Sequence, residues 1–152
     1  MITISLPPEP RSLLRRNLQK AGDREIGGLI LGEQVAPDHF RIVELSLDAA
    51  TGSACHFVRD PAKHEAALRA FFERTGADYR RFNYLGEWHS HPNFPVRPSA
   101  EDVRSMQGLV DGERGIDFSA LLIVRLRFRL ILETASWMFV RHAAPRTVRL
   151  TS

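Results

Sequence analysis

The stretch GEWHSHPNFPVRPSAED, residues 86–102, places two histidines one residue apart and an aspartate eleven positions after the second histidine. Three prolines and a serine separate that histidine pair from the aspartate, and a glutamate and a tryptophan come directly before the pair. The stretch therefore combines side chains that can bind metals or move protons with a backbone that proline restricts.

The first part of this stretch belongs to an expected strand over residues 82–91. Successive side chains of a strand point to opposite faces, so Glu87, His89 and His91 would share one face. Trp88 would then lie on the other face and pack in the core. Two imidazoles separated by one residue on a strand lie close enough to bind one metal ion.

Asp102 can supply a third metal ligand if the loop of residues 92–98 folds back over the strand. A helix is expected to begin at Ser99, with serine at the N-cap and aspartate at N3, an arrangement close to a capping box. Two nitrogens and one carboxylate oxygen, with a fourth position open to water, form the pattern of a catalytic zinc site. Such a site needs a general base beside the water, and geometry alone nominates Glu87.

The remaining sequence predicts a mixture of helices and strands, and hence an α/β or α+β class. The segment EIGGLILGE, residues 25–33, reads as a buried strand whose paired glycines let other backbone approach closely. After Ile116, apolar runs indicate further strands, but no clear loop is visible before Val140. The other expected elements are a helix over residues 8–20, a helix over residues 60–76 with Asp60 as its N-cap, a strand over residues 40–47 and a short strand over residues 54–58.

Composition narrows the functional classes. The chain has 152 residues, 43% of them hydrophobic and 26% charged, as is normal for one folded globular domain. We expect neither a membrane span nor a signal peptide, and the single cysteine excludes an internal disulfide, so a cytoplasmic location is favoured. The net charge of +3 comes with scattered arginines, so nucleic-acid binding is not expected. The four histidines outside the quoted stretch, including His64, are expected at the surface.

The sequence resembles a known family at two places. HSHP at residues 89–92, followed by Ser99 and Asp102, resembles the JAMM motif of the JAB/MPN domain metalloproteases. EIGGLILG at residues 25–32 resembles the Glu-x-x-Gly-Leu-x-x-Gly strand of the same family. The resemblance implies one JAB/MPN domain over residues 1–152, of the compact bacterial type. Its fold would be a mixed β-sheet flanked by helices, similar to the cytidine deaminase core.

The resemblance also implies roles for individual residues. Zn²⁺ would be held by His89, His91 and Asp102. Glu25 would act as the general acid and base, and Ser99 would stabilise the tetrahedral oxyanion. The family pattern thus places the base on a different strand from the one that geometry alone suggests.

The implied activity is that of a zinc-dependent isopeptidase or peptidase that cleaves after the C-terminal tail of a ubiquitin-like protein. Compact bacterial JAB proteins often accompany E1- and E2-like proteins in conjugation or anti-phage defence systems. Others process sulfur-carrier proteins or small substrates, so a zinc hydrolase acting on a small amide is an alternative.

Two further alternatives involve other classes of protein. Catalytically inactive MPN scaffolds usually lack motif residues, whereas this chain has the full set. DNA-linked proteins of the RadC type have a similar His-x-His-Pro pattern, but they typically carry asparagine where this chain has Ser90.

Overall fold

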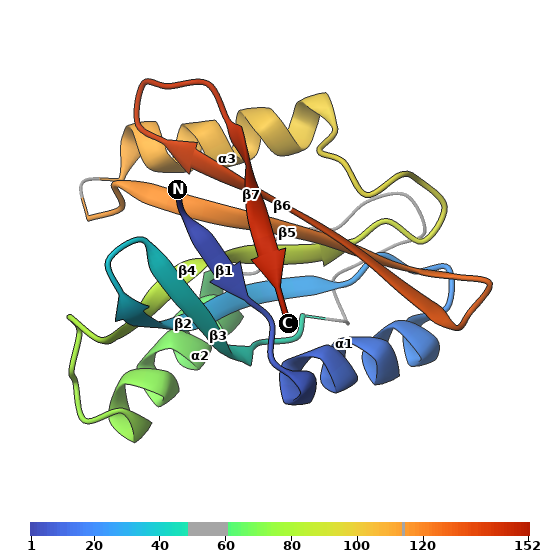
Figure 1. The fold of residues 1–152 in the computed structure, drawn as a ribbon, viewed down its shortest axis with the longest axis horizontal. Helices are drawn as coiled ribbons and strands as arrows, with labels where there is room; N and C mark the ends of the chain where they lie inside the picture. Colours follow the sequence, from blue (N-terminus) through green and yellow to red (C-terminus); the bar gives the residue numbers. More distant parts are fainter. Residues whose placement is uncertain (49–60, 114) are drawn as a thin grey trace.

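The computed structural model of the protein describes residues 1–48, 61–113 and 115–152, and within them it contains three helices and seven strands (Figure 1). The prediction of an α/β fold with a mixed sheet flanked by helices is confirmed. The helices are α1 (Pro8–Ala21), α2 (Pro61–Arg74) and α3 (Ala100–Gly112). The strands are β1 (Thr3–Ser5), β2 (Gly27–Ala36), β3 (His39–Leu45), β4 (Phe82–Ser90), β5 (Phe118–Arg127), β6 (Ile131–Val140) and β7 (Arg146–Thr151).

The strands form one mixed sheet in the order β1-β3-β2-β4-β5-β6-β7. The sheet closes on itself because the short strand β1 pairs in parallel with both β3 and β7. The central strand β4 runs antiparallel to β2 and parallel to β5. None of the described helices is long and apolar enough to span a membrane.

The two faces of the sheet are covered by different helices (Figure 1). Leu14 and Leu18 of α1 pack in the main core with Trp88 and Leu122. On the opposite face, α3 packs against β5 and β6, and α2 packs against β2 and β4. Trp88 is almost fully buried on the α1 side, as predicted. The side chains that alternate with it on β4 therefore point to the face that carries α2 and α3.

Gly28 lies where another part of the backbone approaches β2, as the paired glycines predict. A Cβ atom added to Gly28 would lie 2.2 Å from the carbonyl oxygen of Ser46. That oxygen accepts a hydrogen bond from Trp88 Nε1 at 2.8 Å, and Ser46 Oγ accepts one from the Leu29 N–H at 2.7 Å. The close approach therefore connects the chain after β3 to the centre of the sheet.

The predicted strand over residues 25–33 is present, but it begins later and runs further, to Ala36. The ladder starts at Gly27 because the N–H of Ile26 donates to the Ser90 side-chain oxygen at 3.0 Å. Glu25 thus precedes the strand. The short strand expected over residues 54–58 and the cap expected at Asp60 lie outside the described residues.

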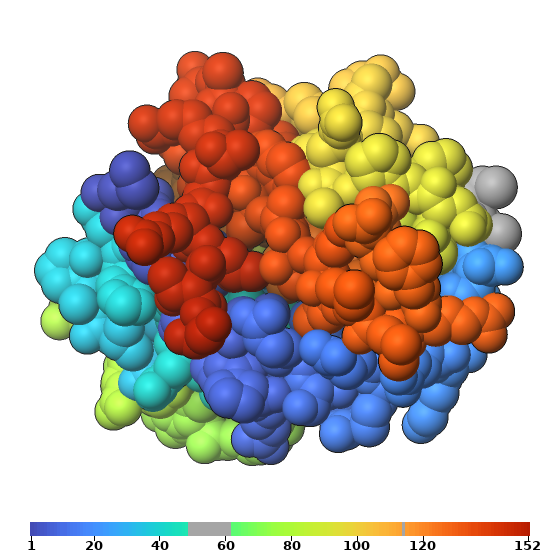
Figure 2. Space-filling model, turned by 45° about the vertical axis from the view of Figure 1, so that its right-hand side comes forward, coloured from blue at the N-terminus to red at the C-terminus, as the bar shows by residue number. Residues whose placement is uncertain are grey.

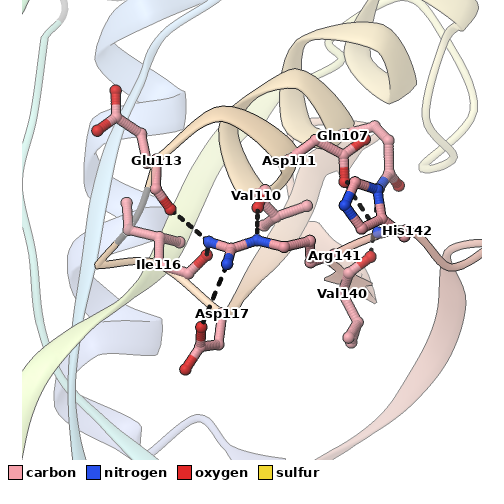
Figure 3. A network of polar contacts seen from close by, with 9 residues as sticks. All are labelled: Gln107, Val110, Asp111, Glu113, Ile116, Asp117, Val140, Arg141 and His142. Carbon is pink, nitrogen blue, oxygen red and sulfur yellow. Dashed lines mark hydrogen bonds and ion pairs between the residues drawn. The ribbon is translucent and has the colours of Figure 1, made fainter.

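The C-terminal end of α3 is fixed by Arg141, which follows β6 (Figure 3). Its guanidinium group donates to the carbonyl oxygens of Val110 at 2.9 Å, Glu113 at 2.6 Å and Ile116 at 3.3 Å. A cation at a helix C-terminus satisfies carbonyl groups that have no partner within the helix. Arg141 thereby holds the far end of the helix whose first turn carries Asp102.

The sequence after Ile116 forms longer strands than its apolar runs indicate. β5 and β6 pair along their whole lengths and are joined by a tight turn in which Phe128 and Arg129 have φ angles of 52° and 60°. Two successive residues with positive φ are typical of type I′ turns, which favour asparagine and glycine, so the sequence gives no sign of a turn here. Strands β1 and β7 are not predicted from the sequence either.

Replacing Gly28 with alanine should destabilise the protein by about 2–3 kcal/mol, because the new methyl group would push Ser46 away from β2 and break its two hydrogen bonds. Urea denaturation measures this change. Gly108→Ala in α3 is a matched control, because a Cβ atom added there would meet no atom within 4 Å outside the local helix backbone in the described part of the chain. That variant should be more stable by about 0.5–1 kcal/mol. Equal stability of the two variants would contradict the close approach.

Candidate metal centre

The two histidines and the aspartate meet at the end of β4. His89 lies in β4, and His91 follows directly after the strand, where its N–H donates to the Val124 carbonyl at 2.9 Å. Asp102 lies in the first turn of α3, which the loop of residues 92–98 brings back over the strand end. His89, His91 and Asp102 are the group among the described residues whose ligand atoms could hold a metal ion.

The three ligand atoms form a nearly equilateral triangle. His89 Nε2 and His91 Nε2 are 3.0 Å apart, and each lies 3.4 Å from Asp102 Oδ2. Zinc at 2.0–2.2 Å from tetrahedral ligands separates those ligands by about 3.3 Å, which is close to all three edges. A tetrahedral ion on this triangle would have its fourth position open, so the donor set fits a catalytic zinc.

The Nδ1 atom of His91 determines the role of its other ring nitrogen. It lies 3.0 Å from the Pro95 carbonyl oxygen, which can only accept, so Nδ1 carries the proton. In the neutral ring Nε2 then has a free lone pair directed at the triangle. A carbonyl that orients a metal-binding histidine in this way is typical of metal centres.

A capping box holds Asp102 in place. The Asp102 N–H donates to Ser99 Oγ at 3.0 Å, and the Ser99 N–H donates to Asp102 Oδ2 at 2.8 Å. The predicted N-cap is therefore confirmed, with aspartate performing the part that glutamate or glutamine usually has. The Ser99 hydroxyl accepts a hydrogen bond in this cap, and its own proton remains able to donate elsewhere.

Charge is arranged so that the cluster attracts a cation. Burial raises the pKa of Asp102, but hydrogen bonds from His89 and His91 outweigh burial and hold that pKa well below its usual range. Burial lowers the pKa of His91, but hydrogen bonds to Asp102 and Pro95 and the negative charge of Glu25 raise it above its ordinary value. Without a metal, the cluster therefore binds a proton tightly, and that proton competes with zinc.

Glu25 lies across from His91. Gly27 pairs with His89, and Ile26 exchanges hydrogen bonds with Ser90. Glu25, which precedes Ile26, therefore faces His91. The Glu25 side chain is only 6% exposed, and its charge acts on His91. The residue implied as the base thus lies beside the ligands.

Glu87 shares the face of the histidines, as the strand pattern predicts, but it lies two positions further from the end of β4. It is buried and lines a groove of about 860 Å³ between α2 and α3. The walls of the groove are largely apolar and include Leu29 of β2, Leu68 and Phe72 of α2, Leu109 of α3, and Ile116. This face of the sheet therefore presents both the candidate metal ligands and an apolar groove.

The prediction that His64 lies at the surface is wrong. His64 is only 9% exposed, and its Nε2 lies 2.6 Å from Asp48 Oδ2. The Asp48 N–H donates to the Gly27 carbonyl at 2.7 Å, so this pair lies beside the start of β2, close in the chain to Glu25. The sequence gives no sign of this pair, because Asp48 and His64 lie on different segments of the chain and meet only in the folded structure.

Zinc affinity should fall as the pH is lowered through the raised pKa of His91, because zinc and the proton compete for the same nitrogen. The decline should begin above pH 6.5, about the ordinary pKa of histidine, and reach at least tenfold per pH unit. Competition with a chromogenic chelator between pH 8 and pH 5 measures the dissociation constant. His142→Gln, which removes an exposed histidine, should leave the curve unchanged, and a flat wild-type curve would contradict His91 as a ligand.

Comparison with known proteins agrees with this geometry. Residues 8–147 match the family of prokaryotic homologs of the JAB domain. A protein of Vibrio cholerae serotype O1, the CD-NTase/cGAS isopeptidase, is 31% identical over 84 residues. That match covers 53% of this chain and 51% of the relative, so the chain spans about half the length of the curated relative that it matches.

Two solved structures share the fold. A protein from Desulfitobacterium hafniense has a TM-score of 0.69 and 23% identity, over 99% of this chain and 91% of its own. A protein from Salinibacter ruber has a TM-score of 0.59 and 18% identity, over 99% of this chain and 90% of its own. At these identities the likeness shows the fold alone. With the match over residues 8–147, the chain belongs to the family of prokaryotic JAB domains.

Proposed function

We propose that this chain is a zinc-dependent isopeptidase or peptidase that cleaves after the C-terminal tail of a ubiquitin-like protein. The observation that carries the proposal is the triangle of His89, His91 and Asp102, whose edges of 3.0–3.4 Å suit a tetrahedral zinc ion. Membership of the JAB family and the isopeptidase relative support the same reaction class.

The chain's own residues would divide the reaction between them. When bound to this triangle, zinc would polarise the scissile carbonyl and make water a stronger nucleophile near neutral pH. Glu25 would take the proton of the attacking water as the new C–O bond forms, and would pass it to the amine as the C–N bond breaks. Its position beside His91 supports this role, because a general base must lie within hydrogen-bonding reach of the water that it deprotonates.

Ser99 would donate its hydroxyl proton to the carbonyl oxygen as that oxygen becomes negatively charged. Its hydroxyl is held at the N-terminus of α3 by the bond from the Asp102 N–H. Helix N-termini favour negative charge, so the position suits an oxyanion.

The groove between α2 and α3 supports an extended substrate rather than a small amide. Its apolar walls would accept side chains of a peptide, and Glu87 of β4 joins it to the face of the sheet that carries the candidate metal ligands. We propose that the whole chain acts as one JAB domain in a conjugation or anti-phage defence system, with E1- and E2-like proteins. Because the matched relative is called a CD-NTase/cGAS isopeptidase, a conjugate of a ubiquitin-like protein with a CD-NTase is the first substrate to test.

Cleavage of such a conjugate, and of a fusion between a ubiquitin-like protein and a reporter, tests the proposal. Glu25→Gln should lower kcat by about 10²–10⁴ while zinc content stays near one ion per chain. Ser99→Ala should lower kcat by about 10²–10³. Glu101→Gln, which neutralises an exposed carboxylate in the same helical turn as Asp102, is the matched control and should keep wild-type activity.

The Glu87→Gln variant shows whether Glu25 or Glu87 is the general base. Near wild-type activity in this variant would support Glu25 as the base, whereas loss of activity in Glu87→Gln alone would move the role to Glu87. Zinc binding without cleavage of either substrate would contradict the proposed substrate class and favour the small-amide alternative. If the wild-type protein binds no zinc, the remaining interpretation is a catalytically inactive scaffold.

A further inference from the structure

The loop that joins the two groups of ligands is attached to the sheet by a side chain outside the motif. Arg125 of β5 donates from Nη1 to the Phe94 carbonyl oxygen at 3.0 Å. The next carbonyl along the chain, that of Pro95, accepts from His91 Nδ1 at 3.0 Å. Two neighbouring carbonyl groups of the loop are thus held from two sides, one by Arg125 and one by a candidate metal ligand.

Arg125 is itself held rigidly. It stands directly opposite Glu133 in the β5–β6 ladder, and its Nε donates to Glu133 Oε2. Arg127 donates to the other oxygen of Glu133 at 3.0 Å. The sheet therefore fixes the position of the Arg125 guanidinium group, and this group in turn fixes the position of the loop.

The surface view shows that the two segments joined by Arg125 lie side by side. The end of the β5–β6 hairpin, in orange, lies against the yellow segment that contains the loop of residues 92–98 (Figure 2). On its other side the hairpin reaches α1, where Arg15 donates to the Leu130 carbonyl at 2.9 Å. The hairpin is thus supported by α1 while it supports the loop.

We propose that Arg125, oriented by Glu133, is a positioning residue for the metal centre. By fixing the Phe94 carbonyl it fixes the adjoining Pro95 carbonyl, which holds the His91 ring and keeps the proton on Nδ1. The inference rests on the zinc site of the proposed function, and it assigns to that site a residue that the motif does not contain.

The direction of the effect separates positioning from simple electrostatics. Removing a positive charge near a zinc site would by itself strengthen zinc binding, because like charges repel. Losing the support of a ligand's hydrogen-bond partner weakens binding instead, typically by about 10–100-fold for a partner in direct contact with the ligand. Arg125 does not touch the ligand's hydrogen-bond partner but the neighbouring carbonyl group, so we expect zinc affinity to fall by about tenfold, the lower end of this range.

The experiment compares zinc-loaded wild type with Arg125→Met and Arg127→Met. Arg127 is the matched control, because it lies on the same strand and binds the same Glu133, whereas the bond to the loop carbonyl comes from Arg125. Chelator competition should show zinc bound about tenfold more weakly by Arg125→Met and within about twofold of wild type by Arg127→Met. In cleavage assays Arg125→Met should lower kcat and leave KM unchanged.

Two further variants keep the test decisive. Arg125→Lys retains the charge but loses the planar fork that binds Glu133 and Phe94 together, so it should resemble Arg125→Met. Glu133→Gln replaces the carboxylate with an uncharged amide, so it holds the guanidinium group less firmly and should weaken zinc binding about threefold, which tests the inference even if Arg125→Met does not fold. In ¹⁵N spectra of the zinc-free protein, Arg125→Met should also lose part of the Nδ1–H form of the His91 ring.

These results are distinguishable from failure of the proposed function. Zinc binding by wild type, with equal or tighter binding by a folded Arg125→Met, would overturn the positioning role and leave the zinc site intact. Wild-type affinity in Arg125→Lys together with tighter binding by Arg125→Met would overturn it in favour of a purely electrostatic effect. Absence of zinc from wild type would overturn both the proposed function and this inference.

Discussion

One oxygen of the Asp102 carboxylate connects helix α3 to the end of β4. Oδ2 accepts the Ser99 N–H at 2.8 Å and lies 3.4 Å from the Nε2 atoms of both histidines. The same contact thus begins the helix and completes the ligand triangle. Because a helix N-terminus needs an acceptor for its free N–H groups, the geometry of the site follows from an ordinary requirement of helix formation.

The sheet provides the precision that this contact requires. β4 lies between β2 and β5, and the pairing of Gly27 with His89 sets the position of Glu25 relative to His91. Close backbone approach at Gly28 and Gly86 lets the neighbouring segments lie tightly against these strands. At the other end of α3, Arg141 donates to the Val110 carbonyl of the helix and to the Glu113 and Ile116 carbonyls of the segment after it. The ligands therefore come from elements that are held at both ends, as a metal site with defined geometry needs.

The three candidate metal ligands could be proposed from the sequence because each lies in a local pattern. The alternation of β4 placed the two histidines on one face and Trp88 in the core, and the spacing from Ser99 to Asp102 indicated the cap. The fold class also followed from the order of apolar segments. The resemblance of residues 25–32 to the family strand, rather than any pattern of polarity, singled out Glu25.

Features that depend on distant contacts were not predictable. The turn at Phe128 and Arg129 has no asparagine or glycine, because the long pairing of β5 with β6 compensates for the positive φ angles. β1 has three residues, and its pairing with β3 and β7 joins segments that are far apart in the chain. His64 is buried by a partner, Asp48, on another element. The support of the site loop by Arg125 is equally invisible in the sequence.

X-ray absorption at the zinc edge of the zinc-loaded protein examines the metal centre itself. We predict one zinc per chain, with two imidazole nitrogens and oxygen ligands at about 2.0–2.2 Å. Replacing Asp102 with alanine should remove one oxygen from this set. Absence of zinc, or zinc bound with a coordination unchanged in the His89→Ala and Asp102→Ala variants, would contradict the proposed metal centre.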